Sequence, residues 1–293
     1  MRIRAEILGQ LSPLVGKPRG WERIVRRLVP MERARELPER VVVRDGLRFP
    51  ANPAIPIGYN VLFFGEYEPE LRQLIRRFVK PGGVAVDVGA NVGWHTLLMA
   101  KMAEPGGRVL AVEANPSVRE RLSQNVKLNG FTNVEIVSRA MADRPQKLTF
   151  FAPAHNSFSA GDGHVVGPGD APDRNAITVE ATTLDDLIAE KNLGRWDFLK
   201  IDVEGFEWPV LQGGSESIAR LQPVIAFEFN VEYAGRGGGS EALFRDFFGQ
   251  RGYTVFASGR TGLRNMGSDP WPDCANLVAL PKGQGPTAVV GEM

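Results

Sequence analysis

Residues 84–93 read VAVDVGANVG, and this stretch decides the fold of the chain. Its first half is a short apolar run typical of a buried strand, and its second half is a glycine-containing loop. The apolar pattern of residues 94–103 then predicts a helix. Glycines let a backbone approach a ligand closely, and the helix start offers free N–H groups. The stretch therefore predicts a ligand-binding loop between strand and helix, with candidate residues Asp87, Gly89, Asn91 and Gly93.

The same alternation of strand and helix continues along the chain. Strands joined by helices need crossover connections, which favour a mostly parallel sheet with helices on both faces. We therefore expect an α/β fold whose ligands bind beyond the carboxyl ends of the strands. Further strands are predicted at 108–112, 134–137, 148–151, 177–181, 198–203, 224–229, 253–257 and 275–280.

The composition narrows the class of protein. Hydrophobic residues make up 43% and charged residues 24%, which excludes a disordered or fibrous chain. The formal net charge of +1 argues against a nucleic-acid binder. A single cysteine, Cys274, excludes an internal disulfide and a cysteine-cluster zinc site. No apolar run reaches the roughly 18 residues that span a bilayer, and the expected location is the cytoplasm.

Changes in composition divide the chain into three parts. Residues 1–70 form a predicted N-terminal cap, residues 71–281 a core domain, and residues 282–293 a flexible tail. The first 40 residues carry ten Lys and Arg against five Glu. This part of the cap is either a helix packed on the core with solvated charges or a contact with an acidic surface or a membrane face.

Carboxylates follow several of the predicted strands. Asn91 stands where a dinucleotide-binding loop has its second glycine, and Asp87 is unsuited to a pyrophosphate. An acidic residue there suits a cationic ligand such as S-adenosylmethionine. Glu113 ends the second strand and could accept both ribose hydroxyls. Asp143 could accept from an adenine amino group, or it could lie in a surface turn.

Several longer motifs together resemble the FkbM family of S-adenosylmethionine-dependent methyltransferases. They are VDVGANVGWHTLLMA, VEANPSVRERLSQNVKLNG, TTLDDLI, FLKIDVEGFEWPVLQGG and the preceding FGEYEPEL. The resemblance runs from about residue 65 to 230. It implies a class I methyltransferase (Rossmann-like) fold, a seven-stranded mostly parallel sheet with the last strand pair reversed. It also implies methyl transfer to oxygen on sugars, glycolipids or polyketide-type natural products.

The resemblance also implies roles for individual residues. The glycine loop would bind the methionine part of the cofactor, Glu113 the ribose and Asp143 the adenine. Glu68 would close over the cofactor or lie in an exposed turn. Trp94 and His95 depart from the residues expected after the glycine loop, which leaves the role of His95 open. The implied cofactor residues are Glu68, Asp87, Gly89, Asn91, Gly93, Glu113 and Asp143.

The acceptor chemistry is expected at the ends of the later strands. Asp202 and Glu204 are two residues apart and project on one face while the strand persists. Either could be the base for an acceptor hydroxyl, or both could be structural. Together with Glu228 they could also bind Mg²⁺, with Asp202 and Glu228 as ligands. His155 is a further candidate base or substrate contact.

The sequence leaves other functions open. The first choice is an O-methyltransferase for a small-molecule hydroxyl acceptor, with no nucleic acid as partner. A methyltransferase for RNA or protein, an NAD- or nucleotide-binding oxidoreductase and a binding module without activity are the alternatives. A homo-oligomer is compatible with the sequence.

Overall fold

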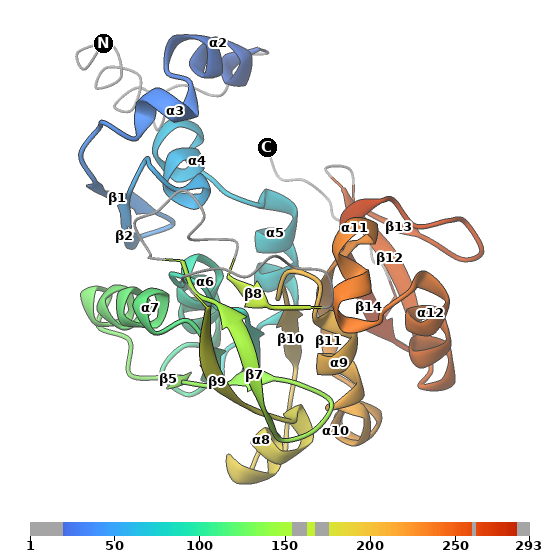
Figure 1. Cartoon of the computed structure of the whole chain (residues 1–293). Helices are drawn as coiled ribbons and strands as arrows, with labels where there is room; N and C mark the ends of the chain where they lie inside the picture. Colours follow the sequence, from blue (N-terminus) through green and yellow to red (C-terminus); the bar gives the residue numbers. More distant parts are fainter. Residues whose placement is uncertain (1–19, 154–162, 168–175, 260–261, 286–293) are drawn as a thin grey trace.

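A computed structural model describes residues 20–153, 163–167, 176–259 and 262–285. Its centre is an eight-stranded sheet in the order β13-β12-β14-β11-β10-β3-β4-β5 (Figure 1). The strands are β3 (Val84–Val88), β4 (Arg108–Val112), β5 (Val134–Val137), β10 (Phe198–Ile201), β11 (Val224–Asn230), β12 (Tyr253–Gly259), β13 (Gly262–Asn265) and β14 (Cys274–Pro281).

The direction of the strands confirms the α/β class. The five strands from β11 to β5 pair in parallel, whereas β14 inserts between β11 and β12 and runs antiparallel to both. The sheet has one strand more than expected, because β13 folds back on β12 as an antiparallel hairpin.

Helices cover both faces of the sheet, and the β3 sequence shows why. Ala85 packs into the hydrophobic core on one face, while Val86 and Val88 pack into the core on the other. A strand buried on both faces must be a nearly continuous apolar run. The first face carries α5 (Pro69–Phe78), α6 (Trp94–Ala103) and α7 (Pro116–Leu128). The second carries α8 (Leu184–Glu190), α9 (Glu207–Gln212), α10 (Ser215–Leu221) and α12 (Glu241–Gln250).

Two of the predicted strands belong to a separate sheet. The segments expected at 148–151 and 177–181 are found as β7 (Gln146–Phe151) and β9 (Ala176–Thr182), which pair antiparallel with each other. Neighbours in a parallel sheet need a crossover connection, usually a helix, and the described residues between β7 and β9 contain none, whereas antiparallel strands pair without one. β6 (Ala140–Met141) and β8 (His164–Val165) complete this four-stranded sheet.

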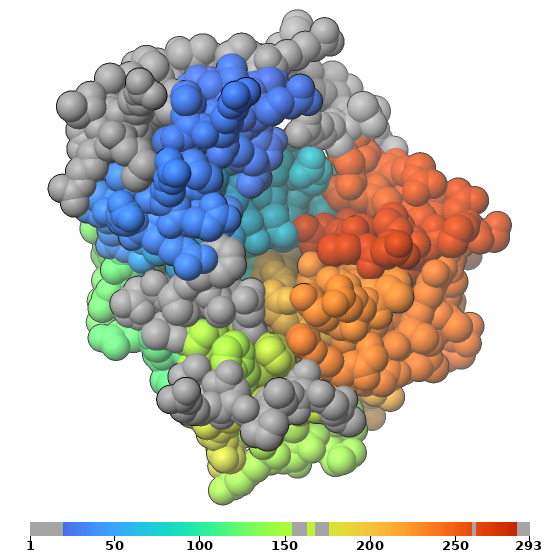
Figure 2. All heavy atoms as spheres, turned by 45° about the horizontal axis from the view of Figure 1, so that its top comes forward, coloured from blue at the N-terminus to red at the C-terminus, as the bar shows by residue number. Residues whose placement is uncertain are grey.

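The N-terminal segment shares its core with the sheet. It contains α2 (Trp21–Leu28), α3 (Met31–Ala34), the hairpin of β1 (Arg40–Arg44) and β2 (Leu47–Ala51), and α4 (Pro56–Phe64). Phe49 packs edge-on against Trp94 with ring centroids 5.0 Å apart, and Trp21 donates to the Phe63 carbonyl. In the space-filling view α5 lies between this segment and the C-terminal strands (Figure 2).

The remaining short helices, α11 (Val231–Ala234) and η2 (Gly235–Gly237), follow β11. Within the described residues, no helix is long and apolar enough to cross a membrane.

Candidate active site

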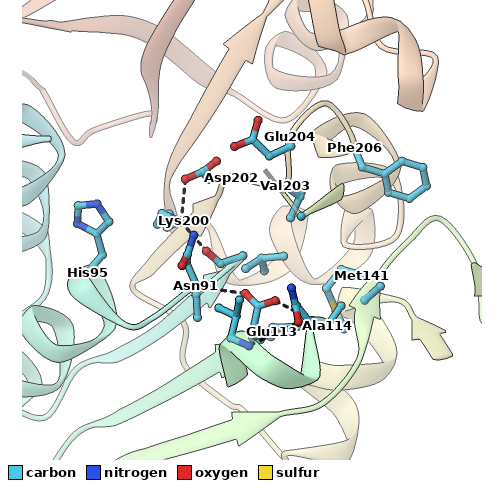
Figure 3. A pocket seen from close by; sticks show the side chains of 18 of the residues that line it. Asn91, His95, Glu113, Ala114, Met141, Lys200, Asp202, Val203, Glu204 and Phe206 are labelled. Carbon is cyan, nitrogen blue, oxygen red and sulfur yellow. Dashed lines mark hydrogen bonds and ion pairs between the residues drawn. The ribbon is translucent and has the colours of Figure 1, made fainter. Parts of the chain in front are cut away.

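The glycine loop forms the floor of a pocket at the carboxyl ends of β3, β4 and β10 (Figure 3). The N–H groups of Gly89 and Ala90 both donate to the Val112 carbonyl at 3.0 Å. Gly89 has φ +77°, and a Cβ there would lie 1.8 Å from the Asp202 carbonyl oxygen. Only glycine fits this crossing of two chain segments. Asn91 also has positive φ and lines the pocket.

Asp87 and Gly93 lie outside the pocket lining, although both are predicted cofactor residues. Asp87 is fully buried, accepts from the Thr96 hydroxyl at 2.6 Å and pairs with Lys200 at 3.3 Å. Gly93 begins α6 with φ +92° against the Leu122 side chain. The structure therefore places these two residues beneath the pocket surface, where they support the loop.

Lys200 holds the ends of β3 and β10 together. Its ammonium group donates to the Gly89 carbonyl at 3.0 Å and lies 3.3 Å from both Asp87 and Asp202. Burial alone would lower its pKa, but the charges of Asp202 and Asp87 outweigh burial and raise the pKa above its ordinary value. Lys200 therefore stays a cation and is unsuited to act as a base at neutral pH.

Glu113, the residue predicted to bind a ribose, lines the pocket. Its carboxylate accepts the N–H groups of Asn91 and Asn115, each at 2.8 Å. Burial raises its pKa to about 6, although both hydrogen bonds favour the charged form. A carboxylate with free lone pairs at a strand end can accept hydroxyl groups.

An apolar wall lies at one end of the pocket, while His95 lies at the other (Figure 3). The wall contains Met141 and Phe206 and offers a flat ring a place to stack. Asp143, the residue predicted to contact adenine, does not line the pocket. Its carboxylate accepts instead from Arg144 and Gln146, at 2.9 Å and 3.0 Å.

Three carboxylates that the sequence places at or after neighbouring strands converge in the structure. Asp202, Glu204 and Glu228 each offer an oxygen, and these oxygens lie within 4.8 Å of one another. β10 ends at Ile201, so Glu204 is not on the strand as expected. It sits in a turn with φ +55°, and Arg236 donates to its carbonyl at 3.0 Å. The convergence comes from this turn rather than from strand alternation.

The pKa values of two of these carboxyl groups are raised. Burial, and then the charges of Asp202 and Glu204, raise the pKa of Glu228 to about 9. Burial also raises the pKa of Asp202, which Lys200 partly offsets. Glu228 is therefore a neutral acid at pH 7 and can donate a hydrogen bond. His155, the remaining catalytic candidate, lies outside the described residues.

The protonation of Glu228 makes stability depend on pH. Between its ordinary pKa of 4.5 and about 9, the folded protein holds a proton that the unfolded chain has released. Stability therefore falls as pH rises across this window. The substitution Glu228→Gln mimics the neutral acid, so we expect it to raise the free energy of unfolding by about 1–2 kcal/mol at pH 8, and by less at pH 5. Urea denaturation at both pH values measures this, and an equal or opposite effect would contradict the assignment.

Some residues around the pocket were not predicted. Ile55 and Ile57 line the pocket, and Asn276 of β14 donates to Glu68 at 2.9 Å. The sequence carries no local signal for these contacts. Glu68, which the family motif singles out, does line the pocket.

Comparison with known proteins identifies the family. The profile described as "Methyltransferase FkbM domain" matches residues 87–255. This range contains the glycine loop, Glu113 and all three converging carboxylates.

Three curated relatives align with parts of the chain. A protein-L-isoaspartate O-methyltransferase of Aeropyrum pernix is 30% identical over 38% of this chain and 48% of its own. The 2-O-methyltransferase NoeI of Sinorhizobium fredii is 24% identical over 52% of this chain and 65% of its own. The hexuronic acid methyltransferase AglP of Haloferax volcanii is 25% identical over 54% of this chain and 61% of its own.

Each alignment thus covers less than two thirds of the relative's length. The family profile, by contrast, matches more than half of this chain and ends shortly before β13. The chain belongs to the FkbM methyltransferase family.

Proposed function

We propose that the chain methylates a hydroxyl oxygen of a small-molecule acceptor. The observation that carries this proposal is the group of three carboxylates beside the glycine loop, because an alcohol must lose its proton as it attacks a methyl group. One relative is named a 2-O-methyltransferase, which supports methyl transfer to oxygen. Another is named a hexuronic acid methyltransferase, which supports a sugar-like acceptor.

The cofactor is proposed to lie along the pocket floor. Its adenine would stack at the wall of Met141 and Phe206, and its ribose hydroxyls would bind Glu113. The methionine part would pass Gly89 and Asn91 toward Glu68 at the other end. This orientation directs the sulfonium methyl group toward Asp202 and Glu204.

The transfer is an in-line displacement in which alignment supplies much of the rate. The acceptor oxygen forms a bond to the methyl carbon while the carbon–sulfur bond breaks, and S-adenosylhomocysteine leaves. We assign the base that takes the hydroxyl proton to Asp202, whose raised pKa suits proton transfer better than an ordinary aspartate. Glu204 and the neutral Glu228 orient the acceptor oxygen.

The same three side chains also fit a divalent cation. Carboxylate oxygens are the ligands that Mg²⁺ prefers, and a cation would offset the burial and the charge repulsion that raise the pKa of Glu228. Asp202, Glu204 and Glu228 would hold such an ion, which lowers the pKa of a bound hydroxyl.

The experiment is methyl transfer from labelled S-adenosylmethionine into a cell extract, with and without a chelator, followed by separation of small molecules from macromolecules. We expect the label in the small-molecule fraction. If a hydroxyl is methylated, the product is a methyl ether, and its label should survive mild acid treatment. With Asp202 as the base, the chelator should change the rate less than about twofold. A loss of more than about tenfold that Mg²⁺ restores would assign the cluster to a metal.

A protein acceptor is the second candidate, favoured by the relative from Aeropyrum pernix. Label confined to protein or RNA would contradict the small-molecule proposal and support a macromolecular acceptor.

A further inference from the structure

The Glu68 carboxylate is held from two sides at the end of the pocket. Its Oε2 lies 2.7 Å from His95 Nε2, and its Oε1 accepts from Asn276 Nδ2 at 2.9 Å. The three residues come from the start of α5, from α6 and from β14. Because each carboxylate oxygen has its own donor, the orientation of the group is fixed by segments far apart in the sequence.

The charge state of Glu68 follows from the same contacts. Burial alone would raise its pKa, but the hydrogen bond and charge of His95, the hydrogen bond from Asn276 and the charge of Lys200 lower the pKa to about 2. An ionised carboxylate only accepts hydrogen bonds, so the proton of the His95–Glu68 bond belongs to Nε2. His95 Nδ1 is buried and has no hydrogen-bond partner among the described residues. Among the described residues, the imidazole of His95 therefore makes its hydrogen bond to Glu68.

Glu68 keeps access to the pocket despite these contacts. Its side chain is 23% exposed, against 7% for His95, and both residues line the pocket. A fixed carboxylate with unused lone pairs favours a cation. At this end of the pocket the proposed cofactor presents its methionine part, which carries an α-ammonium group.

We infer that His95 and Asn276 are positioning residues, which hold Glu68 as an ionised acceptor for the α-ammonium group of S-adenosylmethionine. The inference rests on the cofactor placement proposed above. It predicts that the pocket distinguishes the intact cofactor from thionucleosides without an amino group, and that this discrimination depends on His95 and Asn276.

Calorimetric binding of three compounds tests the inference without a methyl acceptor. S-adenosylhomocysteine has the amino and carboxyl groups, decarboxylated S-adenosylmethionine keeps the amino group alone, and 5′-methylthioadenosine has neither. The variants are His95→Phe and Asn276→Leu, with His95→Gln as a conservative replacement that retains a donor. His164→Phe is the matched control, because His164 lies on β8 and does not line the pocket.

We expect both His95→Phe and Asn276→Leu to weaken the two amino compounds by about tenfold and 5′-methylthioadenosine by less than about twofold. His95→Gln should recover part of the loss, and His164→Phe should bind all three like the wild type. Unchanged binding of 5′-methylthioadenosine shows that a variant retains its adenosine site.

Two results would overturn the inference. An equal loss for all three compounds would show that His95 and Asn276 only support the fold, and an unaffected decarboxylated compound would show that Glu68 does not bind the ammonium group. Failure of the hydroxyl-acceptor proposal would leave these affinities unchanged, so the two failures are distinguishable.

Discussion

Replacing Asp202 with asparagine is expected to lower kcat by about 10²–10⁴-fold, the contribution of a positioned general base. The amide keeps the shape of the side chain 3.3 Å from Lys200 but cannot take the hydroxyl proton. Burial raises the pKa of Asp202, so the wild-type rate should rise with pH through a value above that of an ordinary aspartate. Initial rates of label transfer across the pH range measure both effects.

The affinity for S-adenosylhomocysteine provides the control. It should change little in the Asp202→Asn variant, because the cofactor contacts proposed for Glu113 and Glu68 remain. The exposed Asp269→Asn variant should behave like the wild type. A kcat within about threefold of the wild type would remove Asp202 from the chemistry and leave Glu204 as the candidate.

The second large effect is expected for Lys200→Met. Lys200 is the cation between Asp87 and Asp202, and its side chain is 4% exposed while that of Asp87 is fully buried. Removing one partner of a buried ion pair leaves an uncompensated charge and costs about 3–5 kcal/mol. Urea denaturation at pH 7 measures this loss.

The matched control is Lys147→Met, because Lys147 pairs with Glu180 on the surface and its side chain is 71% exposed. A surface pair contributes little, so the stability of this variant should match the wild type. If Lys200→Met were as stable as Lys147→Met, the ion pairs beneath the loop would not hold the ends of β3 and β10 together.

The parallel half of the sheet could be predicted from the sequence almost residue by residue. The strands expected at 84–88 and 108–112 are β3 and β4 with the same bounds, because strands buried on both faces leave apolar runs that glycines and prolines bound. The sheet to which a strand belongs cannot be read from the residues of that strand alone. The same reasoning found β7 and β9 but could not place them outside the central sheet.

The site was predictable to the extent that strand ends determine it. Asp202 and Glu228 follow or end adjacent parallel strands, so their approach follows from topology. The direction of a side chain within a turn does not follow from the topology of the sheet. Asp87 turns down to Thr96 and Lys200, and Asp143 pairs with its own neighbours in the chain. The contact of Glu68 with Asn276 joins residues 208 positions apart and needs the folded chain.

The central claim is that the pocket at the ends of β3, β4 and β10 holds S-adenosylmethionine with its ribose on Glu113. Calorimetric titration of S-adenosylhomocysteine into the wild type and the Glu113→Gln variant tests it most directly. We predict one site in the wild type and an affinity at least about tenfold weaker in the variant, since a charged acceptor of the ribose hydroxyls is lost. Equal affinity in the two proteins would contradict the claim.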